Sequence, residues 1–305
     1  MSVLVTGARG QLGYDLVKHL LSKGVCVVAT DLQHTENGIL EYFDGTQVAY
    51  FSLDLTDESA VYTSVTNLRP DVVIHCAAWT AVDDAEKLEN RDSVRRINED
   101  ATKFLAAACR DAGCKMVYIS TDYVFSGRGN LAWDPDSQDF EPLNVYGMTK
   151  LSGELAVRSQ LESWFIVRIA WVFGSNGKNF VRTMLNVGRK YETVRVVNDQ
   201  IGTPTYTADL AVFLGELIKS DQYGIYHVTN EGGYISWYDF ACEIFRQAGL
   251  KTRVIPVSTE KYGISLAKRP CNSRLDKSKL VRMGFCPLPD WTDALHRYLK
   301  ECGEI

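Results

Sequence analysis

The sequence predicts an α/β fold in which a doubly wound parallel sheet is combined with a smaller, interwoven C-terminal domain. Short apolar runs rich in Val and Ile alternate with longer amphipathic patterns through the first 174 residues, which is typical of parallel strands covered by helices on both faces. Three glycines stand between the first apolar run and the first helical pattern. After residue 175 the alternation loosens, which indicates the second, smaller unit.

The first part of the chain is expected to hold six strands joined by helices. Each strand is predicted from an apolar run that is too short for a helix, and each helix from an amphipathic pattern. The predicted strands are residues 2–6, 25–30, 48–55, 71–78, 115–121 and 164–174. The predicted helices between them are residues 11–21, 57–67, 90–112 and 147–160.

The second part of the chain alternates helical patterns with loops and contains no low-complexity linker. Its predicted helices are residues 179–190, 207–219, 236–248 and 290–301. We therefore divide the chain into a first domain, residues 1–174, with returning segments near 194–230, and a second domain that holds mainly residues 175–305.

Composition excludes several classes of partner. The chain has 305 residues and a net charge of -5, which disfavours nucleic acid or an anionic membrane as the main partner because both reward a basic surface. No apolar run approaches the roughly 18 residues of a membrane span. The eight cysteines are scattered without C-x-x-C, and the five histidines form no H-x-x-x-H. We expect a cytoplasmic protein with reduced thiols and no metal-centred chemistry.

The glycines near the N-terminus predict a dinucleotide site. Gly7, Gly10 and Gly13 form G-x-x-G-x-x-G directly after the first strand and at the start of the first helix. Glycines allow a sharp turn and let a pyrophosphate approach the backbone, while the helix N-terminus offers free N–H groups to that anion. The position between a strand and a helix supports this interpretation over simple turn punctuation.

The end of the second strand leaves the choice between NADH and NADPH open. Asp31 stands 18 residues after Gly13, where a carboxylate accepts hydrogen bonds from the adenosine ribose and repels a 2'-phosphate. Arg9, inside the glycine turn, would instead attract such a phosphate. The two residues favour opposite cofactors.

The ends of the next strands are expected along the same edge of the sheet, where ligands bind in such folds. The third strand ends in two residues suited to an adenine contact or, equally, to capping the next helix. The fourth strand ends in small residues that leave room for a cofactor. These residues are Asp54, Leu55, Ala77, Ala78 and Trp79.

Tyr146 and Lys150 predict proton chemistry. They lie four residues apart at the start of a predicted helix, so they share one helix face. A neighbouring ammonium is expected to lower the pKa of a tyrosine from about 10 toward the working pH of a general acid. Thr121 and Asp122 end the fifth strand at the same edge, and the Thr121 hydroxyl can bind a substrate oxygen. This group suits the reduction of a ketone by a nicotinamide cofactor.

These motifs resemble the extended short-chain dehydrogenase/reductase family, which has G-x-x-G-x-x-G, a Thr at the position of Thr121 and Y-x-x-x-K. Over nearly the whole chain, STDYVFSG, NVYGMTKLSGE, RIAWVFG, NDQIGTPT and RPCNSRLD are similar to the branch of that family that reduces the 4-keto group of dTDP-4-dehydro-L-rhamnose. The resemblance implies a modified Rossmann fold, NADPH or NADH as cofactor, and a second domain for the sugar nucleotide.

The resemblance also implies roles for individual residues. Tyr146 would be the proton donor, and Lys150 would assist it and hold the nicotinamide ribose. From the residues themselves, Arg269 and Arg274 are candidates to neutralise the substrate diphosphate, with exposed surface arginines as the alternative. Asn98 is expected to serve helix packing or to hold water rather than to catalyse. Substrate contacts would come from Thr121, Asp122 and Trp171. The cofactor would be lined by Gly7, Gly10, Gln11, Leu12, Gly13, Asp31, Asp54, Leu55, Ala77, Ala78 and Trp79, with Tyr146 and Lys150.

Some members of this family form homodimers bridged by Mg²⁺ that glutamates hold. The matching positions here are Asp15, Ala208 and Glu301, so the middle carboxylate is missing, although Asp209 is adjacent. Because a hard cation needs several oxygen ligands, we predict no metal site.

Two alternatives stay open. A sugar-nucleotide epimerase or dehydratase would use the same cofactor and the same Tyr–Lys pair, although a dehydratase usually needs a further carboxylate, and no Glu follows Asp122. A non-catalytic subunit, similar to the regulatory partner of methionine adenosyltransferase, would use neither. The intact set of Thr121, Tyr146 and Lys150 favours an enzyme.

Overall fold

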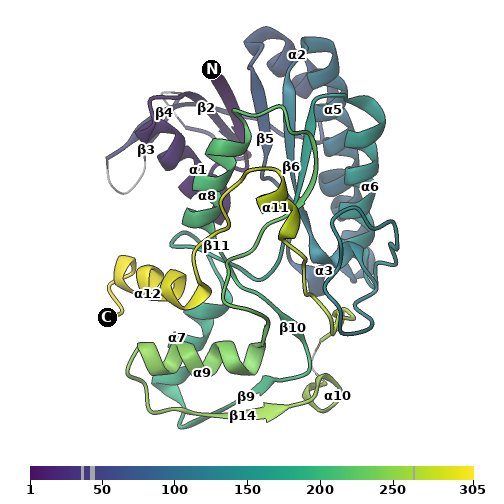
Figure 1. The fold of residues 1–305 in the computed structure, drawn as a ribbon. Coiled ribbons are helices and arrows are strands. Elements are labelled where there is room, and N and C mark those ends of the chain that lie inside the picture. The colour runs from purple at the N-terminus through teal and green to yellow at the C-terminus, as the bar shows by residue number, and fades with distance from the viewer. Residues whose placement is uncertain (36–37, 42–44, 264) are drawn as a thin grey trace.

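The protein is built around one large twisted sheet with helices on both faces (Figure 1). The structure is a computed structural model that describes residues 1–35, 38–41, 45–263 and 265–305. Within these residues, eight strands form the sheet, in the order β12-β7-β6-β5-β1-β2-β4-β3. Neighbouring strands run parallel except for the β3–β4 pair. The α/β fold class predicted from the sequence is therefore confirmed.

The strands of this sheet are short and mostly buried, as expected for a parallel sheet covered on both faces. Parallel pairing brings their carboxyl ends to one edge; for example, Thr121 at the end of β6 pairs with Ile169 at the end of β7. The strands are β1 (Ser2–Thr6), β2 (Cys26–Asp31), β3 (Ile39–Glu41), β4 (Gln47–Ser52), β5 (Val72–His75), β6 (Lys115–Thr121), β7 (Trp164–Ile169) and β12 (Gly224–His227).

Two apolar cores separate the sheet from its helices. On one face pack α1 (Gln11–Ser22) and α8 (Thr207–Leu217), whose buried leucines meet the side chains of β1 and β7. On the other face pack α2 (Glu58–Leu68), α5 (Ala101–Ala112) and α6 (Val145–Gln160). Because α8 and β12 follow residue 200, the chain returns to the sheet after leaving it.

A smaller unit lies below the carboxyl edge of the sheet in Figure 1 and has its own aromatic-rich core. Its buried side chains include Phe173, Phe240 and Tyr298. Two of its strands, β9 (Thr193–Val197) and β14 (Arg253–Val257), pair in parallel. Its longer helices are α7 (Phe180–Lys190), α9 (Trp237–Gln247) and α12 (Trp291–Glu301).

Short elements connect these parts. Two pairs of two-residue strands, β8 with β11 and β10 with β13, tie the units together. Their bounds, with those of the short helices, are β8 (Val172–Phe173), β10 (Ile201–Gly202), β11 (Thr205–Tyr206), β13 (Ile235–Ser236), α3 (Val82–Ala85), α4 (Arg91–Arg95), α10 (Thr259–Tyr262) and α11 (Ser278–Arg282).

Two predicted elements are interrupted in the structure. The strand expected over residues 164–174 ends at Ile169 and resumes as β8, because Trp171 adopts a left-handed backbone with φ of 51°. The helix expected over residues 90–112 contains a π-helical stretch, Arg96–Asp100, between α4 and α5. Such stretches are frequent at functional sites. The strands β3, β9, β12 and β14 were not predicted.

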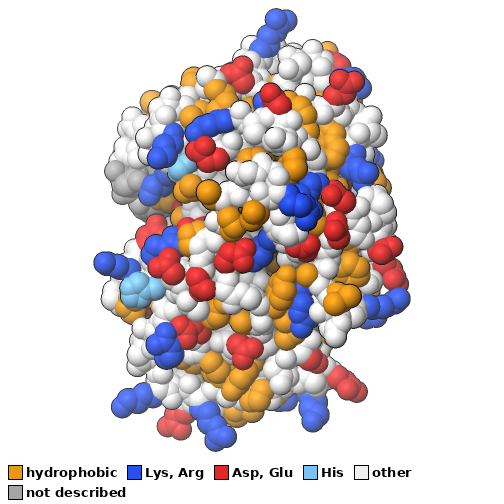
Figure 2. Space-filling model, in the orientation of Figure 1, with side chains coloured by type: hydrophobic (Ala, Val, Ile, Leu, Met, Phe, Trp, Pro, Cys, Tyr) orange, Lys and Arg blue, Asp and Glu red, His pale blue; other side chains and the backbone are white. Residues whose placement is uncertain are grey.

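The surface carries both signs of charge. On the face that Figure 2 shows, acidic and basic side chains are interspersed rather than gathered into one patch. No helix in the described part of the chain has both the length and the apolar character of a membrane span.

Candidate active site

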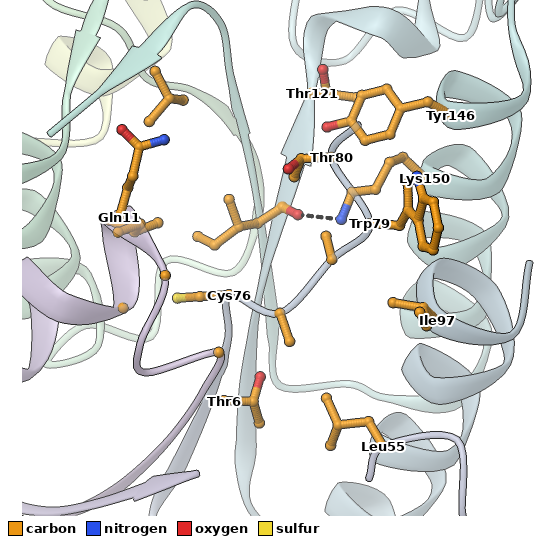
Figure 3. A pocket seen from close by; sticks show the side chains of 18 of the residues that line it. Thr6, Gln11, Leu55, Cys76, Trp79, Thr80, Ile97, Thr121, Tyr146 and Lys150 are labelled. Carbon is orange, nitrogen blue, oxygen red and sulfur yellow. Dashed lines mark hydrogen bonds between the residues drawn. The ribbon is translucent and has the colours of Figure 1, made fainter. Parts of the chain in front are cut away.

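A large cavity opens at the carboxyl edge of the sheet, between the sheet and the smaller unit. Its volume is about 970 Å³, at the upper end of the roughly 300–1,000 Å³ that is typical of ligand pockets. The residues that follow β1, β2, β5, β6 and β7 all contribute to its wall. Every residue predicted for the cofactor lines it. Figure 3 shows part of this wall.

The glycine turn forms one end of the cavity. Gly7 has φ of +66°, and an added Cβ would lie 2.6 Å from the backbone N of Ala77. A Cβ at Gly13 would lie 2.1 Å from the Gly7 carbonyl oxygen. Gly10 precedes α1 without any side chain that caps the helix, so the first N–H groups of α1 are left for another acceptor. This cradle fits the pyrophosphate of a dinucleotide.

Asp31 ties the end of β2 to the glycine turn. Its Oδ2 accepts a hydrogen bond of 3.0 Å from the backbone N of Arg9, and its Oδ1 accepts one of 2.8 Å from the backbone N of Leu32. Asp31 and Arg9 both line the cavity. The acidic and the basic residue that favour different cofactors therefore lie side by side, and the choice between NADH and NADPH stays open.

Tyr146 and Lys150 project from the start of α6 into the cavity, with Thr121 beside the Tyr146 phenol (Figure 3). Asn144 begins this helix by accepting a 2.8 Å hydrogen bond from the backbone N of Gly147. Lys150 is 3% exposed, and its Nζ donates to the Ile119 carbonyl oxygen at 2.7 Å. The structure thus brings together the three residues that the sequence predicted for proton transfer.

The electrostatics differ from the sequence-based expectation that Lys150 lowers the pKa of Tyr146. Burial raises the pKa of Tyr146 above its usual value, and the hydrogen bond with Thr121 is the influence that opposes it. Burial lowers the pKa of Lys150 to about 7, against the opposing charge of Glu154. The expectation was wrong because both groups lie in a poorly solvated wall and the Lys150 amine is directed to a carbonyl. Tyr146 is consequently protonated at neutral pH.

Asp122 lies beside this group and is only 3% exposed. Its Oδ1 accepts a 3.0 Å hydrogen bond from the Thr121 hydroxyl. Burial raises the pKa of Asp122 to about 6. A carboxyl group close to its titration point therefore contacts the hydroxyl at the end of β6.

Two stacked indoles form the opposite wall. The Trp171 ring lies 3.8 Å from that of Trp237, centroid to centroid, at an interplanar angle of 15°. Both line the cavity. A Cβ at Gly202 would lie 3.0 Å from the Trp171 ring, so the backbone fits closely around the indole. Trp171 was predicted from the sequence, whereas Trp237 was not.

Other wall residues escaped sequence reasoning. Arg96 lines the cavity from the π-helical stretch and donates to the Thr56 hydroxyl at 3.1 Å. Lys178 lines it from the loop before α7. Ser236 and Asp239 form a capping-box pattern around Trp237. This pattern could have predicted that Trp237 begins a helix, but not that its indole lines the cavity. Arg96 and Lys178 belong to no motif that marks them.

Asn98 lies in the π-helical stretch and holds the backbone of Trp79. Its Oδ1 accepts from the Trp79 N at 2.8 Å, and its Nδ2 donates to the Trp79 carbonyl oxygen and to the Thr149 hydroxyl, both at 3.2 Å. This position between the end of β5 and α6 agrees with the packing role that the sequence suggested.

Arg269 is not among the residues that line the cavity. Its Nη2 lies 2.7 Å from Asp83 Oδ2 in an ion pair, because α3 presents Asp83 to the loop that carries Arg269. Arg274 donates instead to Asn272 Oδ1 at 2.9 Å. In the described residues, the guanidinium groups predicted for the diphosphate are thus engaged with neighbouring side chains.

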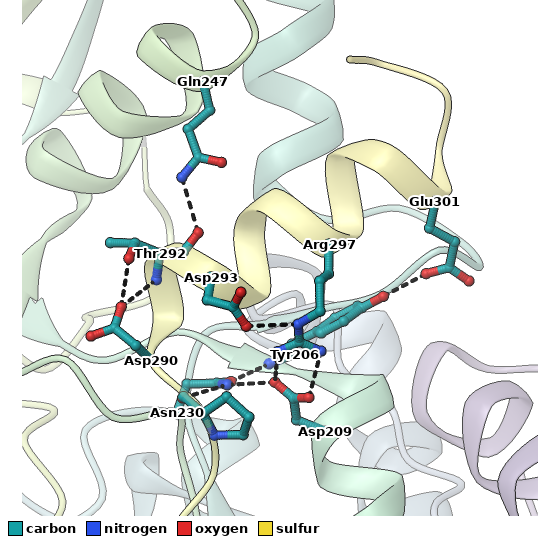
Figure 4. A network of polar contacts seen from close by, with 10 residues as sticks. Tyr206, Asp209, Asn230, Gln247, Asp290, Thr292, Asp293, Arg297 and Glu301 are labelled. Carbon is teal, nitrogen blue, oxygen red and sulfur yellow. Dashed lines mark hydrogen bonds and ion pairs between the residues drawn. The ribbon is translucent and has the colours of Figure 1, made fainter.

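The positions that the family resemblance matches to magnesium ligands lie on α1, α8 and α12. Figure 4 shows two of the carboxylates, Glu301 on α12 and Asp209, which follows Ala208 on α8. Asp15 accepts a hydrogen bond from Thr207, and Glu301 accepts one from Tyr206 at 2.5 Å. Asp209 is held by both terminal nitrogens of Arg297, at 2.7 and 2.8 Å. Since the third carboxylate is paired with a guanidinium, these residues do not fit a divalent cation that needs several free oxygens.

The sheet, the glycine turn and the tyrosine–lysine pair at the carboxyl edge define a Rossmann-type dinucleotide-binding protein. More specifically, the family model described as RmlD substrate binding domain matches residues 1–303, so the chain belongs to that family.

Relatives of the whole chain are known. A dTDP-4-dehydrorhamnose reductase of Streptomyces griseus is 39% identical, with 96% of this chain and 91% of that protein covered. The spore coat polysaccharide biosynthesis protein SpsK of Bacillus subtilis is 38% identical, with 98% and 97% covered. The crystal structure of a dTDP-4-dehydrorhamnose reductase from Bacillus anthracis in complex with NADP is 40% identical, with a TM-score of 0.87 and 98% and 99% covered.

Proposed function

We propose that this protein is an NAD(P)H-dependent oxidoreductase that reduces the 4-keto group of dTDP-4-dehydro-L-rhamnose to give dTDP-L-rhamnose. The observation that carries the proposal is the meeting of Tyr146, Lys150 and Thr121 in the wall of one cavity whose far end is the glycine turn. The names of two relatives at 39% and 40% identity, both dTDP-4-dehydrorhamnose reductases, support the same substrate.

The proposed chemistry needs one proton from the protein. When bound, the reduced nicotinamide supplies the hydride that the keto carbon accepts. The Tyr146 phenol, protonated at neutral pH, donates its proton to the former keto oxygen. Thr121 hydrogen-bonds to Tyr146 and so orients the phenol. Lys150 follows Tyr146 by four residues on α6 and would hold the nicotinamide ribose.

The two ends of the cavity would hold different ligands. The glycine turn with Asp31 and the ends of the third and fourth predicted strands would bind the cofactor. Thr121, Asp122 and the indole of Trp171 would contact the sugar nucleotide, and Trp237, stacked on Trp171, would extend that wall. In this proposal residues 1–174, with the returning segments, serve mainly the cofactor, and residues 175–305 serve mainly the substrate.

The proposal extends to the state of the protein in the cell. A cytoplasmic location agrees with eight cysteines that are all unpaired. A homodimer is proposed from the family resemblance, without a magnesium bridge. Sedimentation of the purified protein with and without a chelator tests it, because a dimer that dissociates on chelation contradicts the absence of a bridging metal.

The test is an absorbance assay with dTDP-4-dehydro-L-rhamnose and either NADPH or NADH. We expect one cofactor molecule to be oxidised for each sugar reduced, and the two cofactors compared at equal concentration decide the preference. An epimerase would convert the sugar without net oxidation of the cofactor. Absence of any turnover, with a stable complex to another enzyme, would support the non-catalytic alternative and overturn the proposal.

A further inference from the structure

The Lys150 amine lies in a buried wall and has few polar partners there. Its side chain is 3% exposed. Within the residues that the structure describes, Nζ has one hydrogen-bond acceptor, the Ile119 carbonyl oxygen at 2.7 Å. An ammonium group has three N–H donors, and a buried charge is costly unless other groups stabilise it. The remaining contacts of Nζ therefore decide how readily this amine keeps its proton.

Tyr118 in β6 contacts Lys150 at both ends of the lysine. The centroid of the Tyr118 ring lies 4.0 Å from Nζ, and the Tyr118 hydroxyl donates to the Lys150 carbonyl oxygen at 3.3 Å. The tyrosine is 0% exposed. A cation within about 6 Å of a ring centroid is attracted to the face of the ring, and more strongly where water is excluded. The Lys150 amine and the Tyr118 ring thus have the geometry of a buried cation–π contact.

The α6 helix leaves room for this ring at one position. A Cβ added at Gly153 would lie 2.7 Å from Cζ of Tyr118, closer than side chains pack. Gly153 stands inside α6, three residues after Lys150, where glycine is less favourable than alanine. The close approach of the Tyr118 phenol gives a physical reason for a glycine in the interior of this helix.

Tyr118 acts on the amine as a neutral ring. Burial raises the pKa of the Tyr118 phenol well above its usual value, so the phenol keeps its proton at neutral pH and offers no phenolate charge. The next residue of β6, Ile119, supplies the carbonyl oxygen that holds Nζ, and Thr121 ends the strand. The end of β6 therefore carries the ring, the carbonyl and the hydroxyl that surround the proposed proton-transfer group.

The ionisable groups near Lys150 do not make the same contact. Glu154 favours the charged amine, but its carboxylate is held by Arg168, with Nε 2.8 Å from Oε1 and Nη2 2.7 Å from Oε2. Burial raises the pKa of Cys76 to about 12 and lowers that of His75 to about 3, so both are neutral at pH 7. The groups around Lys150 on the packed elements are Tyr146 and Glu154 in α6, His75 and Cys76 at the end of β5, Tyr118 and Asp122 at β6, and Arg168 in β7.

We propose that Tyr118 is a positioning residue for Lys150, because the face of its ring holds the amine in the ammonium form and in place beside the cofactor site. The inference rests on the proposed function, in which Lys150 holds the nicotinamide ribose. A charged amine gives one N–H to the Ile119 carbonyl oxygen and keeps two for the ribose hydroxyls. The ring fixes the direction of those two donors.

The test changes the electrostatics of the ring while nearly keeping its shape. Full-length protein labelled with ¹³C at the lysine ε carbons is titrated by NMR, and the Lys150 resonance is assigned by its loss in Lys150→Met. Wild type should titrate with a midpoint near 7, and Tyr118→Phe, which keeps the ring, should do the same. Trifluorophenylalanine at position 118 has a weaker negative potential over the ring face. Its midpoint should lie about one pH unit below that of Tyr118→Phe.

Equal midpoints for the two rings overturn the proposal. A fall in Tyr118→Phe that fluorination does not increase also overturns it, because the effect then belongs to the hydroxyl. If the variants do not fold, the wild-type spectrum decides. Nuclei over the face of an aromatic ring are shifted upfield, so the Lys150 ε protons should resonate upfield of those of the other lysines. An ordinary position for these protons overturns the proposal.

The affinity for NADPH separates this inference from the proposed function. At pH 7 the fluorinated protein should bind NADPH about fivefold more weakly than Tyr118→Phe, because a midpoint one unit lower leaves fewer charged amines. At pH 5 the two affinities should agree. Midpoints that shift as expected without a change in affinity contradict the proposed role of Lys150 at the ribose, and leave the contact with the ring in place.

Expected midpoints and affinities in a protein that oxidises no NAD(P)H with the keto sugar contradict the proposed reduction alone.

Discussion

Burial at the carboxyl edge of the sheet changes the pKa values of the residues proposed for proton transfer and of the neighbouring Asp122. Tyr146 is protonated at neutral pH because burial raises its pKa. Lys150 has its pKa lowered to about 7, so its charge responds to small changes in its surroundings. Asp122, with a pKa raised to about 6, contacts the hydroxyl of Thr121. The proton chemistry therefore depends on burial as much as on the identity of the residues.

Tyr146→Phe is the substitution that tests the proposed proton donor. Loss of a general acid should lower kcat by about 10²–10⁴-fold, while the affinity for NADPH, measured by quenching of indole fluorescence, should change little. Tyr123→Phe is the matched control, because the Tyr123 ring also lines the cavity and lies 5.6 Å from that of Tyr146. If Tyr123→Phe lost more turnover than Tyr146→Phe, the assignment of the donor would be wrong.

The site residues that could be predicted from the sequence are those whose positions follow from their spacing along the chain. Gly7, Gly13 and the Tyr–Lys pair have fixed separations from a strand end or along a helix, and the structure brings them to the cavity. Trp237 and Arg96 reach it through contacts between segments far apart in the chain, which no local pattern encodes. The pKa of Tyr146 was mispredicted for a related reason: desolvation depends on the whole wall, whereas the spacing reports only one neighbour.

The helices and strands position these residues through their ends. α6 starts at an Asn cap, and α9 starts at a capping box in which Ser236 and Asp239 exchange hydrogen bonds. The first residue of α9 is Trp237, which stacks on Trp171. The wall of stacked indoles thus depends on how well the first turn of α9 is held.

Ser236→Ala should show this dependence. Loss of the cap should destabilise the protein by about 1 kcal/mol and raise KM for the keto sugar severalfold, because the turn that carries Trp237 frays. Asp290→Ala offers a control: Asp290 caps α12 by accepting from the Thr292 N at 2.8 Å, away from the cavity. Its variant should lose similar stability in urea titrations without a change in KM. Equal effects of the two variants on KM would contradict the link between the cap and the indole wall.

Elements with a strong periodic pattern were predicted to within a few residues. The helices α1, α7, α9 and α12 and the strand β6 are examples. β12 was missed because its four residues, Gly224–His227, are too few to show a periodic pattern; pairing with β7 makes them a strand. β9 and β14 depend in the same way on each other.

The whole molecule joins its two units by repeated crossings of the chain rather than by a linker. After the strand that ends at Ile169, the chain builds part of the small unit, returns through α8 and β12, and leaves again. The sequence indicated this interweaving from the absence of a linker, but the order of the strands in the sheet lay beyond it, since order is decided by long-range packing.

His75 should make the folded protein sensitive to acid. It lies in the central strand β5, 2.8 Å from the Thr6 hydroxyl, and burial lowers its pKa to about 3, against 6.5 for the exposed side chain. The stability it contributes is present above pH 6.5 and is lost as the pH falls toward the folded value. Between pH 7 and pH 5, wild type should lose about 2 kcal/mol relative to His75→Gln, which cannot take up that proton.

Urea unfolding of both proteins at the two pH values measures this difference. His296→Gln serves as the control, because His296 is exposed in α12 and its removal should leave the difference between pH 7 and pH 5 unchanged. A gap between wild type and His75→Gln that is the same at both pH values would show that His75 is not kept neutral by the fold.

The late arrival of β12 has a consequence for the synthesis of the chain. Until residue 227 has left the ribosome, β7 has an unpaired edge, with backbone N–H and C=O groups that no strand covers. Apart from Arg168, its sequence WFIVRI is apolar. Such an edge invites pairing with other chains. A nascent or truncated product that stops before Gly224 should therefore self-associate. In the finished protein the four residues of β12, which are synthesised after α7 and β9, cover that edge of β7.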